Sequence, residues 1–217
     1  MIQITTVCNA LPAGMCNHCE MTFENLLGLV GFAFVTSVTP GPNNLMLMAS
    51  GANFGLRRTL PHMAGVSLGY AFMALLVGLG LGAAMEAVPP AKTAMKIAAV
   101  GYMLWLAWKM AHASAPGEGK AGGKPFSFLQ AAAFQWVNPK TWAMAVGAMA
   151  AYAGQGGWPQ VALVAGVFAA VNFPSVAVWA TIGQSLRGVL LNPARLRAFN
   201  YTMAALLVAS LWPVLQI

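Results

Sequence analysis

Hydrophobic positions in this chain fall into six long blocks, separated by shorter segments in which prolines, glycines and charged residues gather. A helix needs about 20 consecutive apolar residues to cross the hydrocarbon core of a bilayer, and each block has roughly that length. The pattern therefore predicts six membrane-spanning helices. They cover approximately residues 23–50, 60–84, 92–112, 127–153, 160–183 and 198–216.

The composition supports this interpretation. Hydrophobic residues make up 59% of the 217 residues and charged residues only 7%, and the mean hydropathy is +0.69. A soluble globular domain carries roughly 25% charged residues, so a water-soluble globule is excluded. We predict an all-α integral membrane protein, embedded in the lipid bilayer.

The basic residues explain the formal charge of +7 and indicate an orientation. They do not cluster as a phosphate-binding surface would, so we expect no nucleic-acid partner. Most flank the loops after the first, third and fifth blocks: Arg57, Arg58, Lys109, Lys120, Lys124, Arg187, Arg195 and Arg197. The positive-inside rule places loops 51–59, 113–125 and 184–197 in the cytoplasm and both termini in the periplasm.

A linker rich in glycine, alanine and lysine, residues 113–125 ("ASAPGEGKAGGKP"), divides the blocks into two groups of three. Because three spans per half is an odd number, residues 21–112 and 126–217 must cross the membrane in opposite senses. This is the pattern of two inverted three-helix repeats, which is common in transporters.

Residues 1–20 do not fit this plan, because they have no basic segment of the kind that begins a signal peptide. We expect them to be either a disordered extension or a segment upstream of a true start at Met21. All three cysteines lie here (Cys8, Cys16 and Cys19). The CxxC pair suggests a membrane thiol–disulfide carrier as an alternative function, but Met21–Ile217 contains no cysteine. One pair also has too few ligands for zinc.

The first span is interrupted at "VTPGPNNLMLM", residues 38–48. Its 28 or so residues would make a helix of ~42 Å, longer than the ~30 Å hydrocarbon core. Pro40 and Pro42 each remove an amide donor and clash with the preceding turn, and Gly41 relaxes the backbone. We therefore expect the helix to end near Thr39 and to restart at Pro42, since proline is favoured at the first helical position.

The fourth span repeats this interruption in "FQWVNPKTWAMAVGAM". Asn138 is a candidate helix cap, Pro139 takes the first helical position and Lys140 follows directly. Interrupted spans at matching positions of two halves indicate a transporter binding site. The alternatives are that each proline only kinks a helix for packing, or that the chain is a non-transporting scaffold subunit.

Lys140 favours the interpretation of the two interruptions as a binding site over the packing and scaffold alternatives. A lysine in mid-span costs ~2.5–3.5 kcal/mol on insertion scales, and the chain has no aspartate, while its glutamates lie at span ends or in loops. Two half-helix N-termini and this lysine would attract a carboxylate. The carbonyl ends of the first half-helices, with the side-chain oxygens of Asn43 and Asn44, would suit an ammonium group. A small zwitterionic amino acid meets both demands.

The candidate substrate-binding residues flank the two interruptions. They are Thr39, Pro40, Gly41, Pro42, Asn43, Asn44, Asn138, Pro139 and Lys140. A second rank of candidate lining residues consists of Ser37, Asn172, Pro174 and His62. We expect no enzymatic activity, cofactor or metal. Small-residue helix faces would also permit a homodimer.

Three segments, "TPGPNNLMLMASGANFGLRRTLPHMAGVSLGY", "AAVGYMLWLAWKMA" and "FQWVNPKTWAMAVGA", resemble the LysE/RhtB superfamily of bacterial amino-acid exporters, and most closely its cysteine/O-acetylserine exporter-like branch. The resemblance covers about residues 21–217. It implies a six-span inner-membrane exporter of small amino acids or their derivatives, driven by proton exchange.

One position departs from the family pattern. Many relatives have aspartate after the second proline, whereas this chain has Asn43, which cannot carry a charge. Lys140 is then the best titratable candidate for proton coupling, followed by His62. Because His62 begins the second span beside Arg57 and Arg58, we interpret it as an interfacial residue.

Overall fold

A computed structural model of the protein describes residues 21–112, 124–154 and 156–212, and all regular elements within these ranges are helical. The expected extension at 1–20 and most of the linker lie outside the described residues. The helices are α2 (Phe23–Val38), α3 (Pro42–Phe54), α4 (Leu56–Leu76), α5 (Gly82–Ala87), α6 (Pro89–Ala111), α7 (Phe128–Phe134), α8 (Pro139–Ala148), α9 (Gly157–Leu186) and α10 (Pro193–Ala209).

Short π-helical and 3₁₀ turns continue several of these helices. The π-helical turns are Val77–Leu81 and Met149–Ala153, and the 3₁₀ turns are Gln135–Val137 and Val189–Leu191. The turn at Val77–Leu81 contains Gly80 with φ of 112°, a left-handed conformation that glycine adopts without steric cost. The second span is therefore kinked, whereas its sequence pattern predicted one simple helix over 60–84.

Among the described residues, three of the predicted spans contain helices that are long and apolar enough to cross a bilayer, if the bent pair is counted as one span. Two are the continuous stretches Leu56–Met85 and Gly157–Leu186, each of 30 residues, and the third is the bent pair α2 and α3. Helices also occupy the other three predicted blocks, but α10 has 17 residues and α7 only seven. The protein is thus an all-α membrane protein, and the count of six spans stays a prediction.

Helix α2 packs through one narrow stripe. Its buried residues, Leu29, Ala33 and Ser37, recur every fourth position, as one helix face requires. Phe23 and Phe34, on other faces, are 73% and 54% exposed. Aromatic side chains left uncovered over most of a helix are suited to contact with lipid.

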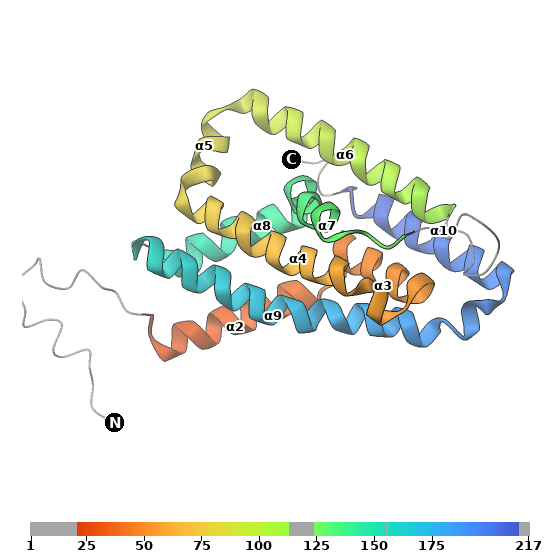
Figure 1. Cartoon of the computed structure of the whole chain (residues 1–217). Coiled ribbons are helices and arrows are strands. Elements are labelled where there is room, and N and C mark those ends of the chain that lie inside the picture. Colours follow the sequence, from red (N-terminus) through yellow and green to blue (C-terminus); the bar gives the residue numbers. More distant parts are fainter. Residues whose placement is uncertain (1–20, 113–123, 155, 213–217) are drawn as a thin grey trace, which may run out of the picture.

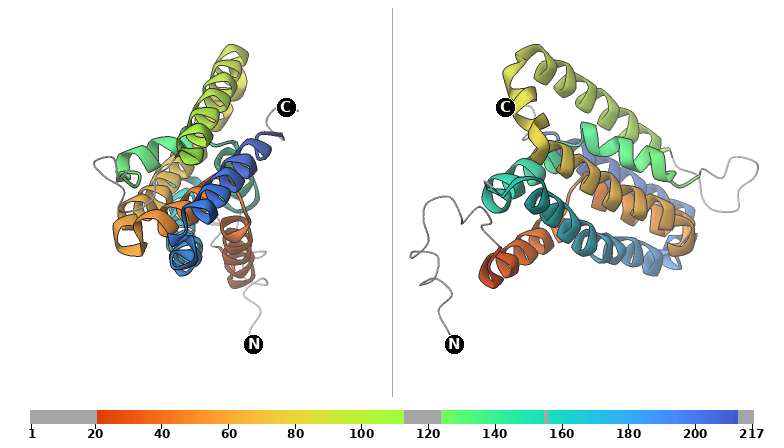
Figure 2. Two further views of the ribbon diagram at one scale, coloured as in Figure 1. Left: turned by 90° about the vertical axis from the view of Figure 1, so that its right-hand side faces the viewer. Right: turned by 60° about the vertical axis from the view of Figure 1, so that its left-hand side comes forward.

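Helix α9 is the central packing element and contacts α2, α3 and α4. In Figure 1, α9 runs the length of the bundle below α4 and α3 and beside α2. Helices α2 and α6 lie on opposite sides of it in every view (Figure 2). The largest cluster of buried side chains joins α4 and α9 through Tyr70 and Phe168, whose ring centres are 5.0 Å apart.

Two glycines allow α3 and α9 to approach closely. A Cβ atom at Gly51 of α3 would overlap the carbonyl oxygen of Ala180, and one at Gly183 of α9 would overlap that of Met48. Backbone carbonyls cannot move aside as a flexible side chain can. The small residues therefore hold α3 directly against the central helix, as is usual for helices packed in membranes.

We predict that Gly183→Ala destabilises the protein by about 1–3 kcal/mol, the usual cost of overpacking. The matched control is Gly166→Ala on the same helix, because a Cβ there would meet no atom within 4 Å. Thermal unfolding in detergent should give a lower midpoint for the first variant and an unchanged or higher midpoint for the second, because alanine favours a helix more than glycine does. Equal midpoints would show that α3 and α9 are not in this close contact.

Candidate functional site

The first interruption has the predicted boundaries. Helix α2 ends at Val38, with Thr39 as its C-cap, and α3 begins at Pro42 after Gly41 in extended conformation. The axes of the two half-helices differ by 58°. Proline at the first helical position has no amide hydrogen to leave unpaired, so the sequence at the bend suits a helix restart.

The prolines also remove donors from the end of α2. In a continuous helix the carbonyl of Val38 would accept the N–H of residue 42, which is Pro42 and has none. The indole Nε1 of Trp179, on α9, donates to this carbonyl oxygen instead, at 3.1 Å. A side chain from the second half of the chain thus replaces a backbone donor lost in the first.

Asn44 pairs two more carbonyls at this bend. Its Nδ2 donates to the carbonyl oxygen of Ser37 at 2.8 Å and to that of Thr39 at 2.9 Å. Asn44 is 3% exposed, so these bonds form where water has little access and a lost partner is costly. The main contact of the Asn44 amide group is with the broken backbone.

The second interruption uses the same chemistry. Asn138 caps α8, since its Oδ1 accepts the backbone N–H of Lys140 at 3.1 Å. The carbonyl of Gln135 would bond to residue 139 in a continuous helix, but Pro139 has no N–H. The Thr141 hydroxyl donates to that carbonyl oxygen at 2.7 Å. The predicted cap and restart at "NPK" are both confirmed.

Two hydrogen-bonded contacts join the interruptions to each other. Nζ of Lys140 donates a short hydrogen bond to the carbonyl oxygen of Thr39. This bond gives the ammonium group a partner in place of the mid-span carboxylate that the sequence lacks. Asn43 and Gln135 pair their amide groups reciprocally, with Nδ2 to Oε1 at 2.8 Å and Nε2 to Oδ1 at 3.2 Å. The bends of α2–α3 and α7–α8 are therefore parts of one structure.

Gly41 is required by the position of Lys140. A Cβ atom at residue 41 would lie 2.7 Å from Cδ and 3.2 Å from Nζ of Lys140, closer than real Cβ atoms normally come. The lysine stem therefore crosses directly over the backbone of the first bend. A side chain at this position would push the ammonium group away from the Thr39 carbonyl.

A further polar chain links α4 and α9 to the first bend. Ser67 Oγ donates to Oδ1 of Asn172 at 2.9 Å, and Asn172 Nδ2 lies 3.2 Å from Oγ of Ser37. Asn172 and Ser37, both second-rank candidates, thus lie beside the interruptions. Pro174 is exposed on α9 and does not line the cavity between the bends.

The cavity between the two bends is small. It measures about 20 Å³ and is lined by residues from both halves, including Asn43, Asn138 and Lys140. A water molecule needs roughly 10–15 Å³ of such space, so this conformation has no room for an amino acid. Nδ2 of Asn138 is buried here and has no hydrogen-bond partner among the described residues, which leaves a donor available to a ligand.

His62 lies elsewhere, and its interpretation as an interfacial residue is wrong. It is 2% exposed and lines a different, larger cavity. The sequence pattern placed it near a span end, but α4 begins earlier than predicted, at Leu56. His62 is therefore nearly two turns inside the helix, where α4 is covered by neighbouring segments.

Sequence reasoning missed four residues of this site: Ser67, Gln135, Thr141 and Trp179. Gln135 had a usable signal, because it is a polar residue in an apolar stretch three positions before the predicted cap. Trp179 had none, since tryptophan is common in membrane helices and its donor role depends on how α9 packs. No group of three potential metal ligands lies together in the described part of the chain.

Comparison with known proteins identifies relatives. The family model described as LysE type translocator matches residues 34–210. The cysteine/O-acetylserine efflux proteins of Escherichia coli strain K12, Shigella sonnei strain Ss046 and Shigella flexneri are each 34% identical to the chain over 110 residues. The match covers 50% of this chain and 55% of each relative.

The chain thus spans about half the length of the curated relatives it matches. No solved structure is similar to it. The family model, however, covers both interruptions and the helices that pack around them. The resemblance drawn from "TPGP" and "NPK" is therefore confirmed: the chain belongs to the LysE type translocator family.

Proposed function

We propose that the protein is a secondary exporter that moves a small neutral amino acid, or a derivative of one, out of a bacterial cell across the inner membrane. One observation carries the proposal. Lys140 lies between two interrupted helices and its ammonium group bonds to a backbone carbonyl, that of Thr39. A cation held by a neutral oxygen is well placed to exchange that partner for a carboxylate, because charge-assisted hydrogen bonds are roughly twice as strong as neutral ones.

The geometry gives each part of a zwitterion a partner. A substrate carboxylate would take the Lys140 ammonium group and the unpaired Nδ2 of Asn138. The Thr39 carbonyl that Lys140 then leaves would become available to the substrate ammonium group. Asn43 is a weaker ammonium partner than its sequence suggested, since its Oδ1 accepts from Gln135 in this conformation.

The relatives indicate the size of the substrate. Their names give cysteine and O-acetylserine as the molecules they export. Both are small, neutral overall and zwitterionic, which is the class that the site chemistry favours. We extend this class, and not either compound, to the present chain.

The proposed architecture has two inverted three-helix repeats, residues 21–112 and 126–217, joined by a cytoplasmic linker. Both termini are periplasmic and loops 51–59, 113–125 and 184–197 are cytoplasmic. The contact pattern supports equivalent halves: α2 packs on α9 as α7 packs on α4, and α6 packs on α10. Such repeats allow one half to move against the other around a fixed site.

Export requires this motion, because the cavity between the bends is too small for the substrate. Opening must separate Asn43 from Gln135 or Lys140 from Thr39, and a bound amino acid would compensate for the hydrogen bonds that are broken. Inward proton movement is the proposed driving force, with Lys140 as the titratable residue at the site.

We predict that Lys140→Met lowers efflux about 10- to 100-fold, since a hydrogen bond to a charged group contributes about 1.5–3 kcal/mol. Methionine keeps the length of the side chain and removes its charge. The measurement is release of labelled O-acetylserine from proteoliposomes that contain the purified protein. The unsubstituted protein must release O-acetylserine or another labelled small neutral amino acid faster than empty liposomes do, or the exporter proposal itself fails.

The matched control is Lys96→Met on α6, which removes a charge from a residue that does not line the cavity. It should keep the efflux rate of the unsubstituted protein. Normal efflux by Lys140→Met, in protein that remains monodisperse in detergent, would remove Lys140 from the transport mechanism.

A second prediction concerns coupling. Acidifying the buffer outside preloaded proteoliposomes should speed efflux of the amino acid, because protons then enter as substrate leaves. An ionophore that dissipates the pH gradient should return the rate to its value without a gradient. Efflux that is indifferent to the gradient would rule out proton exchange and leave the exporter proposal intact.

A further inference from the structure

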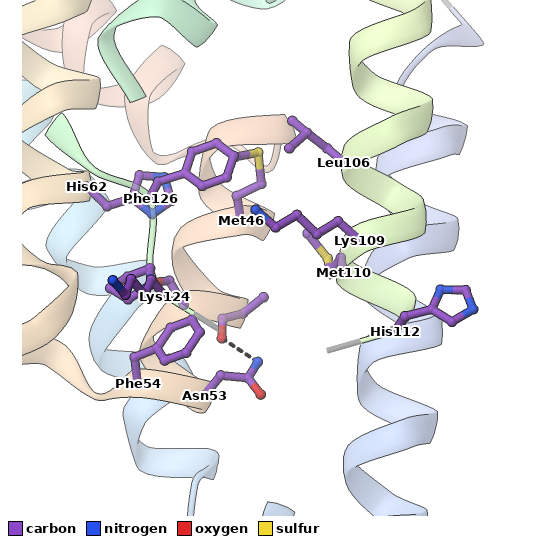
Figure 3. A pocket seen from close by; sticks show the side chains of 13 residues that line it. Met46, Asn53, Phe54, His62, Leu106, Lys109, Met110, His112, Lys124 and Phe126 are labelled. Atoms are coloured by element: carbon purple, nitrogen blue, oxygen red, sulfur yellow. Dashed lines mark hydrogen bonds between the residues drawn. The ribbon is translucent and has the colours of Figure 1, made fainter. Parts of the chain in front are cut away.

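The larger cavity of the protein lies on the other end of α3, away from the two bends. Its volume is about 270 Å³, and it is enclosed by α3, α4, α6 and the segment 124–126. Figure 3 shows side chains from these segments pointing toward one another around it. Since a water needs roughly 10–15 Å³, this cavity can hold a small amino acid with its solvent.

Two polar side chains in this cavity are buried without partners. His62 is 2% exposed, and neither ring nitrogen has a hydrogen-bond partner among the described residues. Asn53 is 5% exposed; its Nδ2 donates to the Ala49 carbonyl oxygen at 2.8 Å, but its Oδ1 has no partner. Each of these atoms exposes less than 1 Å², so a ligand in the cavity pairs with them only after the two side chains rotate, a movement favoured because it satisfies buried polar groups.

Two lysines supply positive charge to the same cavity. Lys109 extends from α6 toward Met46 and Phe126 (Figure 3). Its Nζ lies over the rings of Trp105 and Phe126, 5.2 and 5.7 Å from their centres. Lys124 lies on the opposite side, near His62 (Figure 3). Glu24, the one glutamate whose side chain lies in the described part of the chain, is not among the lining residues.

The cavity is connected to the proposed substrate site by one helix. Met46, Ala49 and Asn53 lie at helical spacing on one face of α3, and Asn43 and Asn44 begin the same helix. From Asn44 to Asn53 the distance along the axis is roughly 14 Å at 1.5 Å per residue. Lys109 and Lys124 lie at the end of the bundle that the positive-inside rule assigns to the cytoplasm.

We propose that this cavity is a cytoplasmic loading site for the exported amino acid, separate from the site between the bends. The substrate carboxylate binds the Lys109 and Lys124 ammonium groups, and its ammonium group donates to Oδ1 of Asn53 and to a ring nitrogen of His62 once these two side chains rotate into the cavity. The inference rests on the proposed export function. It adds a second binding site that precedes the first on the path out of the cell.

The first test measures access to the cavity wall. Because Met21–Ile217 contains no cysteine, replacing Cys8, Cys16 and Cys19 by serine gives a thiol-free background. Ala49→Cys then places one thiol on the cavity wall. Ser185→Cys places the control thiol at an exposed position near the same end of α9. A negatively charged methanethiosulfonate reagent should label both.

O-acetylserine should slow labelling of the Ala49→Cys thiol about tenfold at ten times its dissociation constant, because ligand occupancy reduces the free site in that proportion. Labelling of the Ser185→Cys thiol should not change. The protection should persist when Lys140→Met is added, since the loading site binds without transport. The proposal would be overturned if O-acetylserine did not slow labelling of the Ala49→Cys thiol, or if adding Lys140→Met abolished that protection.

The second test measures uptake of O-acetylserine into inside-out membrane vesicles. Lys109→Gln with Lys124→Gln should raise the half-saturating concentration about tenfold and leave the maximal rate within about twofold, because only loading is weakened. The matched control, Arg195→Gln with Arg197→Gln, removes two charges from exposed residues that do not line the cavity. Unchanged half-saturation in the lysine variant refutes the loading site, whereas export itself is refuted if the unsubstituted protein takes up neither O-acetylserine nor any other small neutral amino acid.

Discussion

The structure depends on one constraint: a carbonyl that a proline leaves unpaired in a bilayer must find a donor within the protein, because lipid offers none. The chain meets this constraint twice with side chains, once from a packed helix and once from the restarting half-helix itself. Trp179 of α9 pairs the Val38 carbonyl, and the Thr141 hydroxyl pairs the Gln135 carbonyl. At the first bend, packing of the bundle and repair of the broken helix are therefore one interaction, whereas the second bend is repaired within its own span.

The local part of this arrangement could be predicted from sequence. Pro42 and Pro139 at first helical positions, and Asn138 as a cap, act on residues within four positions of themselves, so their effects are visible in a short segment. The reciprocal pair of Asn43 and Gln135 spans 92 positions and depends on tertiary packing, which no local pattern encodes. The sequence also placed His62 at an interface, because span ends cannot be located to within two helical turns from composition alone.

If the protein exports an amino acid as proposed, the two cavities would have different roles in that transport. The cavity between the bends offers a charged group and one unpaired donor, Nδ2 of Asn138, but has room for about one water, so a substrate can enter it only after a conformational change. The larger cavity has space, two lysines and unpaired acceptors at the other end of α3. Helix α3 thus touches both cavities, and its close contact with α9 through Gly51 and Gly183 makes it a rigid connection between them.

The central claim is that the two interruptions act as one unit across the two halves. A double-mutant cycle on Asn43→Ala and Gln135→Ala tests it most directly, with the efflux rate of labelled O-acetylserine as the measured quantity. Because the two amides bond to each other, the double variant should lose little more activity than the worse single variant, a coupling of about 0.5–3 kcal/mol. Losses that multiply, as independent sites give, would contradict the account.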